Sequence, residues 1–207
     1  MILVKKDEKL PISTKERILR EAATLFSELG YKASSVRKIA AKVGIRESAI
    51  YNHFKSKEEI FLAIADNIFS TPLQINKETV HEEAKRGKAF LNKFATQYKL
   101  LTFDKNSEKM FRLLLIELFS NEALRERFIR EFHDKNIKLL AEAFFVMMQN
   151  DLIRSNDPML VAYEFLSTLF YIRFHITLLR FDSKSTNHLS TQMEKHVDFF
   201  WEGIKNR

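Results

Sequence analysis

Residues 35–54 read SVRKIAAKVGIRESAIYNHF, and this stretch decides the fold. A helix should start at Ser34 or Ser35, since serine is a favoured capping residue. The positions after it include an apolar face at helical spacing, made by Val36, Ile39, Ala40 and Val43. Gly44 ends this helix, because glycine adopts a left-handed cap at little cost, and Ile50 and Phe54, four apart, predict a second short helix. Two short helices joined by a glycine-containing turn form a helix-turn-helix.

The helix before this motif also has clear ends. Ser13 and Glu16 form a capping box, in which the serine accepts from the backbone and the glutamate reaches back. An apolar face follows, made by Ile18, Ala22, Leu25, Phe26 and Leu29. Gly30 should end this helix, and residues 1–12, polar and closed by Pro11, should form a flexible arm.

A fourth helix is predicted directly after the motif. Ser56 and Glu59 form another capping box, and Lys57 lies in the first turn, where a helix amino terminus and a lysine together favour a phosphate. The apolar face consists of Ile60, Ile64 and Ile68. Thr71-Pro72 should end the helix.

The charge of the chain is concentrated in this region. The whole chain has 34 basic and 27 acidic residues, a net charge of +7. Residues 30–57 contain seven bases and one acid, Glu47, which leaves a net charge of +6. The seven bases are Lys32, Arg37, Lys38, Lys42, Arg46, Lys55 and Lys57. A basic cluster on a helix-turn-helix is typical of a surface that binds nucleic acid.

The second helix of the motif, predicted over residues 46–53, should present its first side chains to base edges in a major groove. Arg46 offers no capping oxygen and meets the positive end of the helix dipole, so we expect it to contact a guanine edge or a phosphate rather than solvent alone. Glu47 suits the dipole and could also accept from a cytosine. Tyr51 could reach a phosphate or pack on the first helix. The predicted DNA contacts are Ser35, Arg37, Arg46, Glu47, Ser48, Ala49, Tyr51, Asn52, His53 and Lys57.

The stretch from Thr14 to Ile64, about a quarter of the chain, resembles the DNA-binding domain of the TetR (tetracycline repressor) family of bacterial transcription regulators. The resemblance is carried by Leu29-Gly30-Tyr31, Ser35-Val36-Arg37-Lys38-Ile39-Ala40, Val43-Gly44-Ile45, Ile50-Tyr51-Asn52-His53-Phe54 and Ser56-Lys57-Glu58-Glu59. Two positions depart from it: the family often has threonine where Ser35 stands, and often serine where Arg46 starts the reading helix.

The resemblance implies that helix 46–53 lies in the groove and that Ser35, Tyr51, His53 and Lys57 contact phosphates. It also implies a homodimer in which the last two long helices pair with the same two of a second subunit. The carboxy-terminal domain would hold a pocket for a small effector, and its ligand would change the spacing of the two reading helices. Such a protein binds a palindromic operator in double-stranded DNA, most often as a repressor.

The remainder of the chain predicts a helical bundle, so the fold class is all-α. Amphipathic segments cover residues 76–104, 107–120, 121–150, 158–181 and 186–205. Asp157 and Pro158 mark a sharp helix start, with aspartate at the cap and proline at the first helical position. We expect the domains to be residues 13–56, with the motif at 35–54, and residues 57–207.

The segment from Met159 to Phe181 is too apolar for a helix that buries only one face. Sixteen of its 23 residues are apolar. The last helix adds Val197, Phe199, Phe200 and Trp201. A helix that is apolar nearly all round must be buried nearly all round, which predicts a partner subunit or else one deep monomer core.

Aromatic residues and methionines at helical spacing predict an interior that is either a packed core or an effector pocket. The candidate pocket residues are Phe90, Phe94, Tyr98, Phe111, Leu114, Phe144, Met148, Phe170, Arg173 and Phe174, with Met147 and His175 beside them. An effector in such a pocket would be apolar or aromatic. Arg173 and His175 are the polar groups that could orient it, or they could satisfy the backbone or extend to solvent.

The sequence lacks the residues that several classes of function require. Cysteine is absent, and four glycines and three prolines are too few for a phosphate-binding loop or a β-rich fold. The histidines and carboxylates form no catalytic or metal-binding pattern, so we expect no cofactor, no metal and no enzyme. No signal peptide or membrane span is predicted, which favours the cytoplasm. Two alternatives stay open: a dimeric DNA-binding regulator without a small-molecule ligand, and a helical lipid carrier or enzyme.

Overall fold

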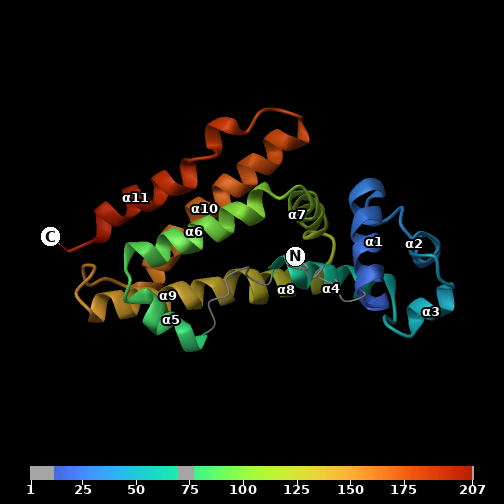
Figure 1. Ribbon diagram of the computed structural model, residues 1–207, viewed down its shortest axis with the longest axis horizontal. Coiled ribbons are helices and arrows are strands. Elements are labelled where there is room, and N and C mark those ends of the chain that lie inside the picture. The colour runs from blue at the N-terminus through green and yellow to red at the C-terminus, as the bar shows by residue number, and fades with distance from the viewer. Residues whose placement is uncertain (1–11, 70–76, 207) are drawn as a thin grey trace, which may run out of the picture. The chain divides into compact units, whose positions relative to one another are not determined.

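The computed structural model describes residues 12–69 and 77–206, and within them every regular element is a helix (Figure 1). The chain divides into two compact units, Met1–Ala65 and Asp66–Arg207. The predicted domain boundary at residue 57 is the first residue of α4 (Lys57–Phe69), whereas the units divide inside that helix. The difference arises because the first turns of α4 supply Ile60, Phe61 and Ile64 to the buried core of the amino-terminal unit.

The amino-terminal unit contains α1 (Thr14–Leu29), α2 (Val36–Val43) and α3 (Glu47–Tyr51). The capping box at Ser13 is confirmed, since both of its hydrogen bonds with Glu16 are present. Of the predicted face of α1, only Leu29 is exposed, because it lies in the last turn beyond the core. The arm at residues 1–11 and the predicted stop at Thr71-Pro72 lie outside the described residues.

The first helix of the motif, α2, ends as its residue types predict. Gly44 takes the left-handed conformation, with φ 77° and ψ 36°, and its N–H donates to the carbonyl of Ala40 at 2.9 Å. A residue with a Cβ atom would be strained in this backbone conformation. In the core behind it lie Ile39, Ala40, Val43, Ile50 and Phe54, all buried.

The carboxy-terminal unit is a bundle built mainly from five elements: α6 (Lys88–Phe103), α7 (Lys105–Glu117), α9 (Lys135–Gln149), α10 (Pro158–Phe181) and α11 (Gln192–Ile204). Shorter elements complete it: α5 (Lys77–Ala84), α8 (Glu122–Arg127), the π-helix η1 (Phe128–Asp134) and the 3₁₀ turn η2 (Asn187–Leu189). Helix α10 packs on α9, and α11 packs on α6 (Figure 1). None of the helices in the described ranges is long and apolar enough to cross a membrane.

The start of α10 is confirmed, since the Asp157 side chain accepts from the N–H of Met159 at 2.8 Å and Pro158 is the first helical residue. The helix predicted over residues 76–104 is wrong as a single element, because the chain breaks between α5 and α6. Gly87 has φ 56° there, and a Cβ atom at this position would lie 2.8 Å from a ring carbon of Trp201. The close approach of α11 therefore requires a glycine at the break.

Two further helices differ from their predicted form. The segment 121–150 is helical from Glu122 to Gln149, but the π-helix η1 interrupts its α-helical hydrogen bonding. The helix predicted over 186–205 starts as η2 and becomes α-helical only from Gln192. In both cases the apolar spacing correctly predicted a helical segment. It did not predict the irregular turns, which depend on packing rather than on local propensity.

Candidate nucleic-acid interface

The reading helix α3 is short and faces outward. It spans Glu47–Tyr51 rather than 46–53, because Phe54 is buried and the chain turns after Tyr51 to bring it into the core. The N–H groups of His53 and Phe54 both donate to the carbonyl of Ile50, at 2.9 and 3.0 Å. Ile50 is the one buried residue of α3, so this single side chain anchors the helix to the domain.

Arg46 occupies the N-cap of α3, and its side chain makes no capping hydrogen bond. An arginine at this position leaves the amide groups of the first turn without a side-chain acceptor and adds positive charge to the positive end of the helix dipole. The helix start is therefore a place where an anionic partner would be stabilised.

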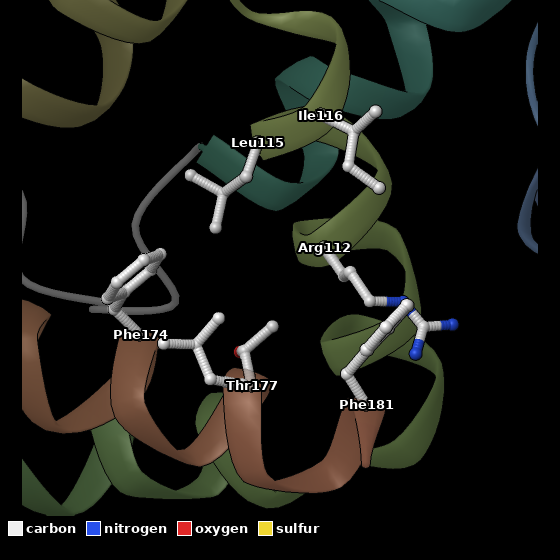
Figure 2. Close-up of a pocket in the computed structure, with 7 residues that line it drawn as sticks. Arg112, Leu115, Ile116, Phe174, Thr177 and Phe181 are labelled. Carbon is white, nitrogen blue, oxygen red and sulfur yellow. The ribbon is translucent and has the colours of Figure 1, made fainter.

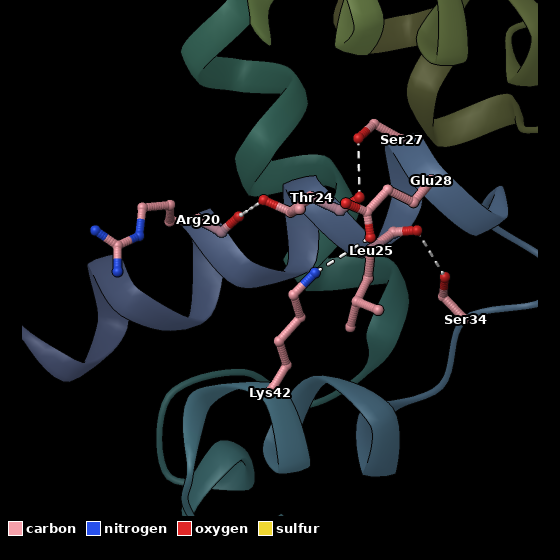
Figure 3. A network of polar contacts seen from close by, with 7 residues as sticks. All are labelled: Arg20, Thr24, Leu25, Ser27, Glu28, Ser34 and Lys42. Carbon is pink, nitrogen blue, oxygen red and sulfur yellow. Dashed lines mark hydrogen bonds and ion pairs between the residues drawn. The ribbon is translucent and has the colours of Figure 1, made fainter.

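The turn of the motif is held by contacts to α1. The guanidinium of Arg17 donates to the carbonyl of Val43 at 2.6 Å. Lys42 forms an ion pair with Glu28 at 3.2 Å, and the buried hydroxyl of Ser34 lies within hydrogen-bonding distance of the carbonyl of Leu25 (Figure 3). The same hydroxyl also donates to the carbonyl of Gly30 at 2.9 Å. These bonds fix α2 and the turn after it, so the position of α3 follows from α1.

The seven cations of the basic segment divide into two groups. Lys38, Lys42 and Lys57 bond to carbonyls or a carboxylate of their own domain. The other four make no side-chain hydrogen bond or ion pair with any residue in 12–69 or 77–206: Lys32, Arg37, Arg46 and Lys55. All four are exposed, and they flank both helices of the motif, so their charge is available to a partner.

The remaining predicted DNA contacts are placed as follows. The hydroxyl of Ser35 accepts from the N–H of Lys38 at 3.2 Å and caps α2. Tyr51 is 52% exposed, so its ring is not part of the buried core of the amino-terminal unit. Ala49 is half-buried, and the others are exposed: Glu47, Ser48, Asn52 and His53. Apart from Ser35 at the start of α2, these residues lie in or directly after α3, and all of them except Ala49 are exposed.

Lys57 has an internal role that its position in the sequence did not reveal. Its ammonium donates to the carbonyls of Tyr31 and Ser34, both at 2.9 Å, and lies 4.2 Å from the centroid of the Tyr31 ring. The lysine therefore ties α4 to the loop between α1 and α2. A phosphate contact by Lys57 stays a prediction and would use the same ammonium.

We predict that Lys57→Ala weakens binding to every DNA sequence alike and lowers the salt slope of log K by about one unit, because one phosphate contact is lost. The melting temperature of the amino-terminal unit should also fall, because two carbonyls lose their donor. Binding titrations at several salt concentrations, with thermal unfolding of the same samples, measure both effects. A loss confined to one DNA sequence would contradict the phosphate assignment.

The candidate pocket residues of the carboxy-terminal unit mostly lie in its interior. Phe90, Phe94, Tyr98, Phe111, Leu114, Phe144 and Arg173 are buried, and Met148 and Phe170 are half-buried. Phe174 does not join them: it is exposed and lines a groove of about 280 Å³ between α7 and α10, with Arg112 and Phe181 (Figure 2). His175 is half-buried and lies 6.0 Å from Tyr171, ring to ring.

A second hollow was missed by sequence reasoning, except for Phe170. A pocket of about 180 Å³ lies between η1, α9 and α10 and is lined by Phe128, Phe132, His133, Ile137, Tyr163, Leu166, Ser167 and Phe170. Three of these residues belong to the π-helix, whose extra residue per turn moves them off the spacing of an α-helix. The sequence signal that could have marked two of them is the spacing of Phe128 and Phe132, which are four residues apart and stack at 5.1 Å.

The apolar excess of α10 divides between the core and an exposed stripe. Leu160 and Tyr163 are exposed near the start of the helix, and Tyr171, Phe174, Leu178 and Phe181 are exposed at intervals of three or four residues along its second half. On α11, Phe199 is 82% exposed. We call these seven residues the α10 stripe. Exposed apolar surface of this kind is typical of a protein–protein interface.

Comparison with known proteins gives sequence matches that include the helix-turn-helix region. The family model described as bacterial regulatory proteins, TetR family, matches residues 18–64. The HTH-type transcriptional repressor KstR2 of Mycolicibacterium smegmatis is 46% identical over 50 residues, which are 24% of this chain and 24% of KstR2. For the curated relatives compared, the matched stretch spans between about a quarter and about half of their own length.

Solved structures share the fold over nearly the whole chain. A TetR-family regulator from Mesorhizobium loti superposes with a TM-score of 0.72 at 20% identity, covering 93% of this chain and 97% of that one. The complex of SmeT with triclosan superposes with a TM-score of 0.71 at 18% identity, covering 93% and 92%. SmeT is the repressor of a Stenotrophomonas maltophilia multidrug efflux pump. Because these structures cover 93% of the chain, the similarity of fold includes the carboxy-terminal unit, which the family model does not reach.

Proposed function

We propose that the protein is a DNA-binding transcriptional repressor of the TetR family, on the premise that residues 18–64 match the model of that family of bacterial regulatory proteins. The observation that carries the proposal is the outward-facing helix α3, held by Ile50 alone and flanked by Arg37, Arg46 and Lys55, whose side chains bond to nothing in the described chain. Together with Lys32, these exposed cations would provide phosphate contacts, and the exposed face of α3 would provide base contacts.

A gel-shift titration with DNA from the promoter of the protein's own gene tests this proposal. We expect a discrete complex at nanomolar protein, much weaker binding to shuffled DNA, and a steep loss of affinity between about 50 and 200 mM salt. Absence of a complex with any duplex at low salt would contradict the proposal and would favour a helical lipid carrier or enzyme.

The proposed regulator acts as a homodimer. The α10 stripe gives each subunit an apolar surface that a second copy can cover by pairing α10 and α11 of both subunits. A two-fold dimer presents two copies of α3, and a palindromic operator would match them with half-sites about 34–36 Å apart.

The proposed control is a small effector bound in the carboxy-terminal unit. A ligand that binds better to the state with widely spaced reading helices shifts the population toward it and releases the DNA. The buried aromatic residues and the pocket at η1 provide an apolar environment for such a molecule. A thermal-shift screen with hydrophobic compounds tests this step, and a uniformly flat response would favour a regulator without a ligand.

We predict that Arg46→Ala reduces operator affinity by about 1–3 kcal/mol if its guanidinium reads a base. Stability should be unchanged, because the side chain is exposed and makes no capping bond. The ratio of operator binding to random-DNA binding is the decisive measurement. An unchanged ratio would refute base reading and leave a phosphate contact.

A further inference from the structure

Arg173, a buried arginine inside the carboxy-terminal unit, has no counter-ion among the residues that the structure describes. Arg173 of α10 is 1% exposed, and its three guanidinium nitrogens have no hydrogen-bond partner within the described residues. Burial lowers its pKa, the nearby Tyr98 raises it in part, and no carboxylate acts on it. An isolated buried charge is strongly unfavourable, so buried cations are normally paired.

Aromatic rings surround this guanidinium. Its central carbon lies 3.8 Å from the centroid of Phe111 and 5.7 Å from that of Tyr98. Phe170 lies 6.0 Å from Phe111 in an edge-on contact, and Phe132 lies 5.8 Å from Phe170. Ring faces stabilise a cation, but they accept none of its N–H hydrogen bonds in the way an oxygen does.

A second unsatisfied donor lies beside the first. The hydroxyl of Tyr98 is buried without a hydrogen-bond partner in the described part of the chain. Burial raises the pKa of Tyr98 to about 12, so at neutral pH the hydroxyl keeps its proton and can donate. The Tyr98 oxygen can accept from the guanidinium, and the pKa values of both groups reflect that interaction, but the Tyr98 O–H and the remaining guanidinium N–H groups have no acceptor within the described residues. An anionic, acceptor-only group would satisfy both.

An apolar pocket lies one ring away from this pair of groups, although neither Arg173 nor Tyr98 lines it. Phe132 and Phe170, which adjoin the rings around Arg173, also line the pocket of about 180 Å³ at η1. Phe128, Ile137 and Leu166 form other parts of its wall. An apolar cavity of about 150 Å³ holds a molecule the size of benzene. The pocket therefore has room for an aromatic ring or a short alkyl chain.

We propose that Arg173 binds the carboxylate of a small, otherwise apolar acid, with Tyr98 donating a second hydrogen bond and the pocket at η1 receiving the apolar part. The inference rests on the proposed function, since it specifies the chemical class of its effector. The planar guanidinium matches a carboxylate with two parallel hydrogen bonds. One arginine balances one negative charge, which favours a carboxylate over a doubly charged phosphate ester.

The test compares acids with their neutral esters on the purified full-length protein. Octanoate and 4-butylbenzoate are each titrated beside their methyl esters by calorimetry, against wild type, Arg173→Met and Arg180→Met. Arg180 is the matched control: it lies two turns further along α10, stacks on Phe103 at 5.2 Å and is half-buried, but it reaches the carbonyl of Thr102. Thermal unfolding of each ligand-free protein is recorded in parallel.

Wild type and Arg180→Met should bind at least one acid about 10- to 100-fold more tightly than its ester, and Arg173→Met should lose this preference. Ligand-free Arg173→Met should melt at or above the temperature of wild type, because an unpaired buried charge has been replaced by an apolar side chain of similar length. The proposal is overturned if no acid binds, if acid and ester bind equally, or if ligand-free Arg173→Met melts well below wild type, which would make the guanidinium a structural group.

The two proposals fail in different ways. Operator binding is measured in the same samples without ligand. Absence of acid selectivity in the wild type, with intact DNA binding, counts against the carboxylate site alone. Absence of DNA binding counts against the regulator, and the comparison of acid with ester still decides what Arg173 binds.

Discussion

Tyr171→Glu combined with Leu178→Glu should convert the proposed dimer to a monomer and reduce operator affinity by about a thousandfold. Both residues belong to the α10 stripe and are exposed in the single chain, so the substitutions should leave the fold of one subunit intact. In a two-fold interface each substitution occurs twice, and burying unpaired carboxylates costs several kcal/mol per ion. A monomer keeps one reading helix, and its affinity approaches that of non-specific binding.

Light scattering after size exclusion gives the mass, and gel shifts on a full palindrome and on a half-site give the affinities. Leu100→Glu is the matched control, because Leu100 is equally exposed but lies on α6 outside the stripe. The control should remain dimeric and bind the palindrome normally. A double variant that stays dimeric would place the interface elsewhere, and a monomer with full affinity for the palindrome would remove the argument for a dimeric regulator.

The features predicted correctly from the sequence are those decided by a few neighbouring residues. The capping box at Ser13, the left-handed turn at Gly44 and the start of α10 at Asp157 each depend on bonds within four positions. Their energies do not depend on what the rest of the chain does, so a local pattern suffices to locate them. The helix-turn-helix could be predicted from the sequence for the same reason.

The features that were missed depend on contacts between distant segments. The break at Gly87 follows from the approach of Trp201, more than a hundred residues later in the chain. Lys57 bonds to carbonyls 23 and 26 positions earlier, which no helical spacing indicates. The residues of the candidate interface could therefore be predicted, but the hydrogen bonds that Lys57 makes within its own domain could not.

Helix α10 shows how much the apolar periodicity of a sequence can predict about which residues are buried. Its 16 apolar residues indicated more than one buried face, but spacing alone could not assign each residue to a face. Phe170 and Phe174 are four apart and were placed together in the interior, whereas Phe174 lies in the exposed stripe. Arg173 shares the buried face with Thr177 and Ile176. A charged residue on that face was the sequence signal for a polar group inside the bundle.

Ile50→Ala should abolish operator binding while leaving the carboxy-terminal unit folded. Ile50 is fully buried and is the sole anchor of α3, so truncation creates a cavity beneath the reading helix and costs about 2–5 kcal/mol. A loss of that size is comparable with the whole stability of a small domain. Circular dichroism melting reports the domain, size exclusion reports the remainder of the molecule, and a gel shift reports the affinity.

The matched control for this variant is Leu29→Ala, which removes a side chain of the same size from an exposed position at the end of α1 and should cost well under about 1 kcal/mol. Ile50→Ala and Arg46→Ala then separate two causes of weak binding. Arg46→Ala lowers affinity at constant stability, since it removes a contact to DNA, whereas Ile50→Ala lowers both, since it releases the helix that carries the contacts. If Ile50→Ala kept full operator affinity despite a lower melting temperature, α3 would not be the element that reads the DNA.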